Sequence, residues 1–323
     1  MQNSVKIIIV MIIKILVERI NHMMALEGII SLFLIISVGV YASKKNIITK
    51  EINKGLTDLL LNITLPLLII SSFNLKFSDE IKTNIIICTL YSGITLVVAI
   101  IISKFLLKPL KKEDKYIIQF SNVFSNCGFM GFPIIEGLYG KEGLIYASIF
   151  NVLFTIFMWT YGVGLFTGGI SKENVKKVLG NPSIVAVFIG IIIMVFGIEV
   201  PSIIMKPIEM VGGITSALSM IIVGVILSNV KFKEYMKDIS LYYGVFLKLL
   251  VVPIMVYFLM AVLPGPAKVM KIIVLLHAMP TAAMLPIFAE SFNKDKEYAS
   301  VLLFMSTLFC VVTFPVVLLI VGQ

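Results

Sequence analysis

Long apolar runs follow one another along almost the whole of this sequence. Between charged residues and Gly or Pro breaks there are ten runs, at 26–43, 56–73, 81–107, 116–139, 143–166, 182–196, 207–228, 239–263, 271–292 and 298–321. A helix needs about 20 mostly apolar residues to cross a bilayer, so ten crossings leave only short connections. We therefore expect an all-α polytopic membrane protein with ten transmembrane helices and no sizeable soluble domain.

Composition agrees with this class and excludes others. Hydrophobic residues make up 59% of the 323 residues, charged residues make up 14%, and the mean hydropathy is +1.04. A soluble domain averages about 45–50% apolar and about 25% charged residues. Cys88, Cys127 and Cys310 lack metal-ligand spacing, and the chain has only two histidines. We therefore expect no enzyme activity, no metal site and no cofactor.

The positions of the lysines predict an orientation. The connections after the first, third, fifth, seventh and ninth runs hold 17 lysines, and the opposite connections hold six. Basic loops are retained on the cytoplasmic side during insertion, so the odd-numbered connections are expected inside. The net charge of +9 is explained in this way without nucleic acid as a partner.

Residues 1–23 fit this scheme badly. Lys6, Lys14, Glu18 and Arg19 interrupt or follow their apolar stretch, and a lysine at the bilayer centre costs about 2.5–3.5 kcal/mol on insertion scales. Two interpretations stay open. The segment is either an untranslated extension, with a start at Met23 or Met24, or an eleventh or interfacial helix.

Two parts of the chain resemble each other. The pattern Phe132-Pro133-Ile134, Lys141-Glu142, Tyr146-Ala147-Ser148 returns as Leu285-Pro286-Ile287, Lys294-Asp295, Tyr298-Ala299-Ser300. The matched pieces occupy the same place in two halves of five spans, and because five is odd the second half is expected to lie inverted. This predicts a first repeat at 24–170, a short cytoplasmic linker at 171–181 and a second repeat at 182–323.

Both matched spans contain helix-breaking residues. Gly128, Gly131 and Pro133 interrupt the fourth span, and Pro280 and Pro286 interrupt the ninth. In hydrocarbon a freed backbone group costs several kcal/mol unless protein, water or ligand satisfies it. Two broken helices at corresponding positions therefore predict a binding site at the midplane of a secondary transporter. Simple proline kinks are the alternative.

At these residues the sequence resembles the auxin efflux carrier family, which includes plant auxin exporters and bacterial malate and malonate permeases. The resemblance rests on Leu65-Pro66, on 126–133 with Tyr139-Gly140, on 248–253, on 277–286 and on Ser306-Thr307-Leu308. It implies two inverted five-helix repeats whose broken helices four and nine cross, a fold like that of the bile-acid symporters. It also implies a scaffold of helices one, two, six and seven, a moving part made of the others, and a homodimer. The short link between helices five and six resembles the bacterial permeases, so a multi-pass protein of the bacterial cytoplasmic (plasma) membrane is expected.

The resemblance implies that Asn126 holds a substrate carboxylate. Its amide offers two donors, and the positive ends of half-helices at the break attract an anion. Alternatively, Asn126 satisfies freed backbone groups. Where plant carriers have a second amide this chain has Thr281, which argues against auxin as the substrate. The expected substrate-binding set is Asn126, Gly128, Gly131, Pro133, Pro280, Thr281 and Pro286.

Three further residues are candidates for a proton or charge role. Lys248 lies inside the eighth span, where it could attract an anion or snorkel to the cytoplasmic surface. His277 could carry a proton, or it could be a buried, hydrogen-bonded structural histidine. Glu136, one turn after Pro133, could face the outer end of the pathway or simply water.

These expectations converge on a secondary transporter, a permease or efflux carrier for a small organic acid anion such as malate, working by alternating access. Its expected partners are the carboxylate substrate and the lipid bilayer. A cation antiporter is not favoured, because residues 145–161 of the fifth span contain no acid. A non-transporting membrane sensor or structural protein of the same fold stays open as the alternative.

Overall fold

The computed structural model describes residues 30–74, 78–110, 112–167, 180–228, 230, 235 and 237–322. Every regular element in this part of the chain is a helix, so the predicted all-α class is confirmed. Residues 1–23 and nearly all of the predicted linker 171–181 lie outside the described residues.

The first half of the described chain begins with the helix Ile30–Lys44. It continues with α2 (Lys50–Leu59), the π-helical turn η1 (Leu60–Thr64), α3 (Leu65–Ser72), α4 (Asp79–Leu106), α5 (Lys112–Val123), the π-helical turn η2 (Cys127–Gly131), α6 (Phe132–Phe157), the π-helical turn η3 (Met158–Gly162) and α7 (Val163–Thr167). Inside α6 the chain turns at Gly140, whose φ of 63° is a left-handed conformation that favours glycine. This turn falls in the connection predicted between residues 139 and 143.

The second half has the same kind of elements. They are α9 (Pro182–Val195), α10 (Ser202–Ser228), α11 (Ile239–Phe246), the π-helical turn η5 (Leu247–Val251), α12 (Val252–Val262), α13 (Ala267–Ala278), α14 (Leu285–Ser291) and α15 (Lys296–Gly322). Six continuous helices of the described chain are long and apolar enough to cross a membrane, and the helices Ile30–Lys44 and Pro182–Val195 are shorter apolar ones. The prediction of a polytopic membrane protein is therefore confirmed.

Local sequence sets where several helices begin. The side chains of Thr49, Ser78, Asn181 and Asp238 each accept a hydrogen bond from a backbone N–H in the first turn of the helix that follows. Such caps satisfy donors that the helix itself cannot pair.

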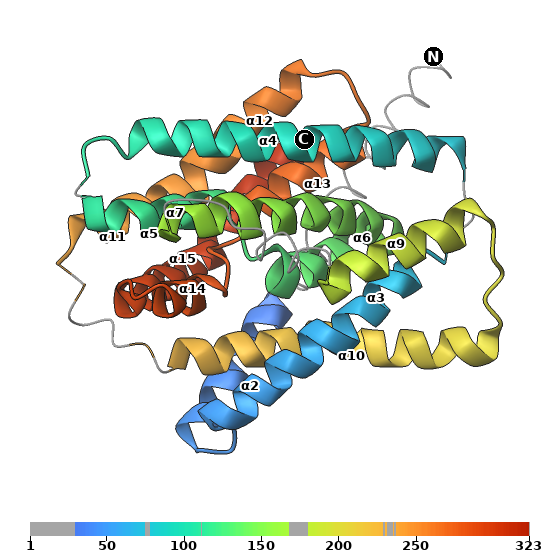
Figure 1. Ribbon diagram of the computed structural model, residues 1–323, viewed down its shortest axis with the longest axis horizontal. Coiled ribbons are helices and arrows are strands. Elements are labelled where there is room, and N and C mark those ends of the chain that lie inside the picture. Colours follow the sequence, from blue (N-terminus) through green and yellow to red (C-terminus); the bar gives the residue numbers. More distant parts are fainter. Residues whose placement is uncertain are drawn as a thin grey trace, which may run out of the picture.

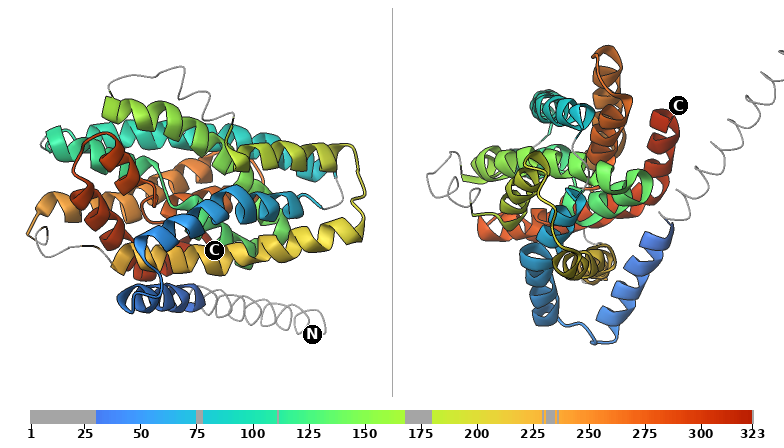
Figure 2. Two further views of the ribbon diagram at one scale, coloured as in Figure 1. Left: turned by 60° about the horizontal axis from the view of Figure 1, so that its bottom comes forward. Right: turned by 90° about the vertical axis from the view of Figure 1, so that its right-hand side faces the viewer.

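Most helices run along the longest axis of the molecule (Figures 1 and 2). One group forms around α3, which packs between α9 and α10. A second group forms around α13, which packs against α4, α6, α12 and α15. In Figure 1, α4 and α10 lie on opposite sides of the molecule, with α6 and α13 between them.

The helix Ile30–Lys44 joins the first group through glycines. A Cβ at Gly39 would collide with the backbone oxygen of Ile221 on α10, and a Cβ at Gly224 would collide with the backbone oxygen of Ile36. Small residues at facing positions let two membrane helices touch backbone to backbone. These two glycines therefore hold the first helix against α10.

The outer faces of the helices are apolar. On α4, Leu90, Ile94, Val97, Ile101 and Phe105 are all exposed and recur at helical spacing. A continuous apolar stripe of this kind is unfavourable in water and favourable against lipid tails. The stripe is therefore consistent with a lipid-facing side of α4.

Candidate functional site

Two interrupted helices cross near the centre of the structure. The first interruption is the non-helical stretch 124–126 between α5 and η2, and the second is the stretch 279–284 between α13 and α14. Ser125 and Thr281 form an isolated antiparallel bridge. The N–H of Asn126 donates to the oxygen of Pro280 (2.7 Å), and the N–H of Ala282 donates to the oxygen of Phe124 (3.0 Å). Each break thus satisfies backbone groups of the other.

The crossing does not lie at the prolines that the sequence comparison aligned. Pro133 and Pro286 stand at the second positions of α6 and α14, several residues beyond the crossing, whereas Pro280 lies within it. Of the prolines predicted to interrupt the two spans, Pro280 is therefore the one that lies at the crossing. A proline without an N–H is well tolerated near the start of a helix. Each break is instead stabilised by backbone hydrogen bonds to the other broken segment. The sequence of one span alone does not indicate these bonds.

Lys248 is buried at the crossing. It lies on η5 with none of its surface exposed, and its Nζ donates to Ser125 Oγ (2.5 Å) and to the backbone oxygen of His277 (3.4 Å). Snorkelling to the cytoplasmic surface, one of the two expectations for this residue, is therefore wrong. Among the described residues the ion pairs are Lys141–Glu209, Lys268–Glu142 and Lys296–Glu290. None of these includes Lys248.

Two more nitrogen-bearing side chains at the crossing lack partners. Asn126 is 2% exposed and its Nδ2 has no hydrogen-bond partner in the described structure. His277 is fully buried, and neither ring nitrogen has a partner there. The histidine ring instead meets Phe150 edge-on, with centroids 5.3 Å apart. The expectation of a hydrogen-bonded His277 is thus wrong, although the expected burial is found.

These unpartnered groups bear on what the site holds. A buried donor or acceptor left unsatisfied costs about 1–3 kcal/mol, and native proteins keep such groups rare outside functional sites. The backbone of Asn126 is well used, since its oxygen accepts from the N–H groups of Met130 and Gly131. Its side-chain amide nitrogen makes no such contact. The alternative role for that amide was to satisfy freed backbone groups. Its Nδ2 does not do so, because it donates to no backbone oxygen in the described structure.

Thr281 differs from Asn126 because its polar groups are occupied. Its hydroxyl shares a hydrogen bond with Ser121 Oγ (2.6 Å), and its backbone N–H donates to Ser306 Oγ (3.2 Å). These contacts tie the second break to α5 and α15. In this structure Thr281 holds the crossing together, and its predicted contact with substrate stays a prediction.

The two glycines of η2 serve different purposes. A Cβ on Gly131 would lie 2.9 Å from Leu276 Cδ2, so this glycine permits the close approach of η2 to α13. A Cβ on Gly128 would meet nothing within 4 Å. Gly128 therefore borders open space, two residues after Asn126 and its unpartnered amide.

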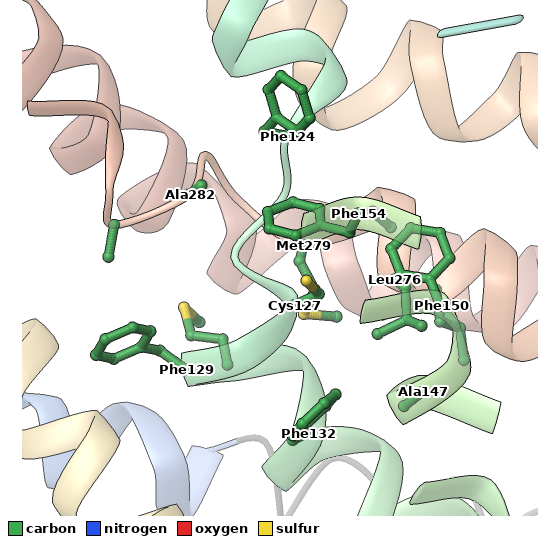
Figure 3. Close-up of a cluster of buried hydrophobic side chains, with 14 of the residues drawn as sticks. Phe124, Cys127, Phe129, Phe132, Ala147, Phe150, Phe154, Leu276, Met279 and Ala282 are labelled. Carbon is green, nitrogen blue, oxygen red and sulfur yellow. The ribbon is translucent and has the colours of Figure 1, made fainter. Parts of the chain in front are cut away.

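Apolar side chains surround the crossing. Figure 3 shows Phe124, Phe129, Phe150, Phe154 and Met279 around the unwound chain that leads into η2, and all five are buried. A few polar groups set among aromatic and aliphatic side chains are typical of a small-molecule site.

Two cysteines were given no role from sequence because their spacing fits no metal site. Cys127 and Cys310 are both buried beside the crossing. The Sγ of Cys127 donates to Asn151 Oδ1 (3.4 Å), and that of Cys310 donates to the oxygen of Ala278 (3.9 Å). Only the tertiary arrangement brings them near Lys248. The pattern of polar residues along a single span does not indicate that these cysteines and Lys248 lie close together.

Glu136 lies away from the crossing. It is half-buried on α6 and faces Ser216 on α10. At the same end of α6, Lys141 pairs with Glu209 of α10 (2.5 Å) and Glu142 pairs with Lys268 (2.9 Å). These contacts connect α6 to its neighbours, and sequence analysis missed them because the partners are more than 60 residues apart.

Comparison with known proteins covers most of the chain. The membrane transport protein family matches residues 24–177 and 166–318. An uncharacterized transporter of Methanothermobacter thermautotrophicus is 23% identical over 294 residues, which are 90% of this chain and 96% of the relative. An uncharacterized transporter of Methanocaldococcus jannaschii is 23% identical over 304 residues, with 89% and 96% covered. The uncharacterized transporter YfdV of Escherichia coli is 25% identical over 201 residues, with 58% and 62% covered.

Proposed function

The chain belongs to the membrane transport protein family, that of the auxin efflux carriers, and we propose that it carries a small organic acid anion such as malate. Membership of this family makes it a transporter and not an enzyme. The anionic substrate, the position of its site and the transport cycle are our proposal.

One observation carries the choice of an anion. Lys248 brings a positive charge into a fully buried position where, among the described residues, no carboxylate pairs with it. A buried charge without an opposite charge is strongly unfavourable, and a charge-assisted hydrogen bond to a carboxylate relieves this cost. Asn126 Nδ2 offers further donors for the same carboxylate, and the ring of His277 offers a partner for a hydroxyl or a second carboxyl group.

We propose ten transmembrane helices in two inverted repeats of five. The backbone bonds at the crossing support this. Exchanging residues 124–126 with 280–282 turns the bond from Asn126 to Pro280 into the bond from Ala282 to Phe124. This is the relation that a two-fold axis in the membrane plane produces, because corresponding segments then meet antiparallel.

The same repeats suggest how the substrate moves. We propose that the helix Ile30–Lys44, α2 with α3, α9 and α10 form a fixed scaffold. The elements that carry the crossing are proposed to move against this scaffold in alternating access. Asn126, Lys248 and His277 all lie on the proposed moving part, so a bound anion would travel with it. The plasma membrane is the proposed location, in keeping with the lysine-rich odd-numbered connections.

The function is tested by counterflow in proteoliposomes. Vesicles loaded with an unlabelled anion are diluted into traces of labelled acetate, lactate, malonate, succinate or malate. We expect at least one label to accumulate, and we expect Lys248→Gln and Asn126→Ala to reduce its accumulation strongly by weakening binding at trace concentration. Lys45→Gln removes the same charge from an exposed position and should have no effect. If no label accumulates with well-folded protein, the proposed carboxylate specificity is wrong.

The inverted arrangement is tested by cysteine labelling in intact cells. Cys88, Cys127 and Cys310 are all buried, so they give a low background. A cysteine introduced by Lys45→Cys should react only with reagents that reach the cytoplasm. One introduced by Lys206→Cys should react with impermeant reagents from outside. Reaction of the first site from outside would contradict the orientation and the inverted repeat together.

A further inference from the structure

The buried charge of Lys248 also bears on the empty carrier. Its Nζ has three donors but only two acceptors within hydrogen-bond distance in the described structure, Ser125 Oγ at 2.5 Å and the oxygen of His277 at 3.4 Å. Both acceptors are neutral. The site therefore has a donor and a positive charge left over when no ligand is present.

Among the side chains that the structure describes, no carboxylate of a neighbouring element forms an ion pair with Lys248. Its turn, η5, packs against α5, α11, α12, α13 and α15. The acidic residues of these elements stand at their ends: Glu113 and Asp114 in the first turn of α5, Asp238 capping α11, Asp295 just before α15, and Glu297 in its first turn. Asp238 and Asp295 are also occupied, as acceptors of backbone N–H groups. No carboxylate in the described part of the chain neutralises this charge, so Lys248 in its protonated form needs an anionic ligand as its counter-charge.

The charge also has to move with the site. Lys248 is bonded to Ser125 in the first break and to His277 at the end of α13. It therefore joins η5 to both interrupted helices. Any rearrangement that opens the crossing first to one side of the membrane and then to the other therefore moves this ammonium group together with the site.

We propose that the protein is an anion exchanger, in which the site returns across the membrane only with an anion bound. This rests on the proposed function. The site is neutral and crosses readily when the bound anion carries one negative charge, as acetate, lactate or a dicarboxylate with one protonated carboxyl group does. Without an anion, and while Lys248 keeps its proton, the site has to cross with an unpaired charge, which is unfavourable in the low dielectric of the membrane. Release of one anion is therefore followed by binding of another before the site returns.

The test is efflux from proteoliposomes preloaded with whichever labelled anion of the counterflow panel accumulates most. Vesicles are diluted into buffer with or without the same unlabelled anion. We expect efflux to be at least about tenfold faster with external anion, because a charge at the bilayer centre slows the return of the empty site by at least that factor. Equal rates in the two buffers would overturn the exchange proposal. Absence of flux for every anion would instead overturn the proposed function, and exchange with it.

Membrane voltage gives a second measurement on the unmodified protein. When efflux runs without external anion, the empty site must bring its positive charge back inward, so an inside-negative potential set with potassium and valinomycin should accelerate it. Efflux in exchange for external anion should not respond. A voltage-independent rate without external anion would contradict an empty carrier that bears a charge.

The variant Lys248→Gln ties this behaviour to the residue. With saturating internal anion, any remaining efflux should lose its dependence on external anion, so that the ratio of the two rates falls toward one. The matched control Lys45→Gln should keep the ratio of the unmodified protein. A Lys248→Gln protein that keeps that ratio would show that another group enforces exchange.

Discussion

Replacing Lys248 with methionine should make the empty protein more stable and abolish its response to substrate. Removing a buried ammonium from water costs several kcal/mol, and a hydrogen bond from a charged donor returns about 1.5–3 kcal/mol. Lys248 has only two such bonds, one of them 3.4 Å long. Substituting buried ionic groups with apolar ones of similar volume is often neutral or stabilising, by about 1–4 kcal/mol.

This free energy converts into a measurable shift of Tm. With an entropy of unfolding of about 2.1 cal/mol/K per residue, a chain of 323 residues shifts by about 1.5 °C per kcal/mol. Lys248→Met should therefore raise the Tm of the empty protein by up to about 6 °C. The single tryptophan, Trp159, packs against Phe288 of α14 at a centroid distance of 5.3 Å, so its fluorescence reports unfolding near the site.

The second part of this experiment measures how malate changes the Tm. A ligand at a hundred times its Kd stabilises the folded protein by about 2.7 kcal/mol, which corresponds to a rise of about 4 °C in the unmodified chain. Lys248→Met should show no rise. Lys45→Met, at an exposed position, should change neither Tm nor the malate response. A Lys248→Met protein that unfolds several degrees earlier, or that malate stabilises normally, would refute the view of Lys248 as an unpaired charge awaiting an anion.

Three further predictions concern the broken helices. Asn126→Ala should remove the malate-induced rise in Tm while leaving the Tm of the empty protein unchanged or slightly higher, because its Nδ2 has no partner to lose; an undiminished malate rise would mean that this amide does not touch the anion. Gly128→Leu should fill the open space beside η2 and weaken malate binding measured by the same shift, whereas Gly55→Leu, also in open space but exposed on α2, should not. Pro133→Ala should let a regular helical bond form after η2 and reduce counterflow without loss of stability, whereas Pro286→Ala, near the start of a helix where the N–H needs no acceptor, should leave counterflow unchanged.

The helical class and the approximate spans could be predicted because they depend on local properties. A membrane helix is indicated by about 20 apolar residues within one segment. Its backbone hydrogen bonds form within that segment and need no distant partner. The turn at Gly140 could be placed for the same reason, since its left-handed φ is a property of a single residue. The ion pair of Lys141 with Glu209 depends on two helices meeting, and nothing near either residue indicates it.

The burial of Lys248 could not be predicted from the residues around it in the sequence. A lysine some nine residues into a span can bend its long side chain to the membrane surface, or it can be held inside. Which of the two occurs is decided by Ser125 and by the carbonyl of His277, and these lie 123 and 29 residues away. The same crossing leaves the His277 ring against Phe150 without a hydrogen bond, which polarity alone could not indicate.

Three prolines of this fold follow π-helical turns, in which the helix is locally wider, and they do not cause the breaks at the crossing. Pro66, Pro133 and Pro253 each stand two residues beyond a π-helical turn, η1, η2 and η5. In each case the residue before the proline donates to the oxygen five residues back, so the helix continues despite the missing N–H of the proline. In two of the three turns the residue five before the proline belongs to the site: Gly128 borders the open space in η2, and Lys248 lies in η5. A wider turn places such a residue out of the regular helical register without ending the helix. The breaks at the crossing arise because each segment finds its backbone partners in the other, so they depend on both halves of the chain being folded together.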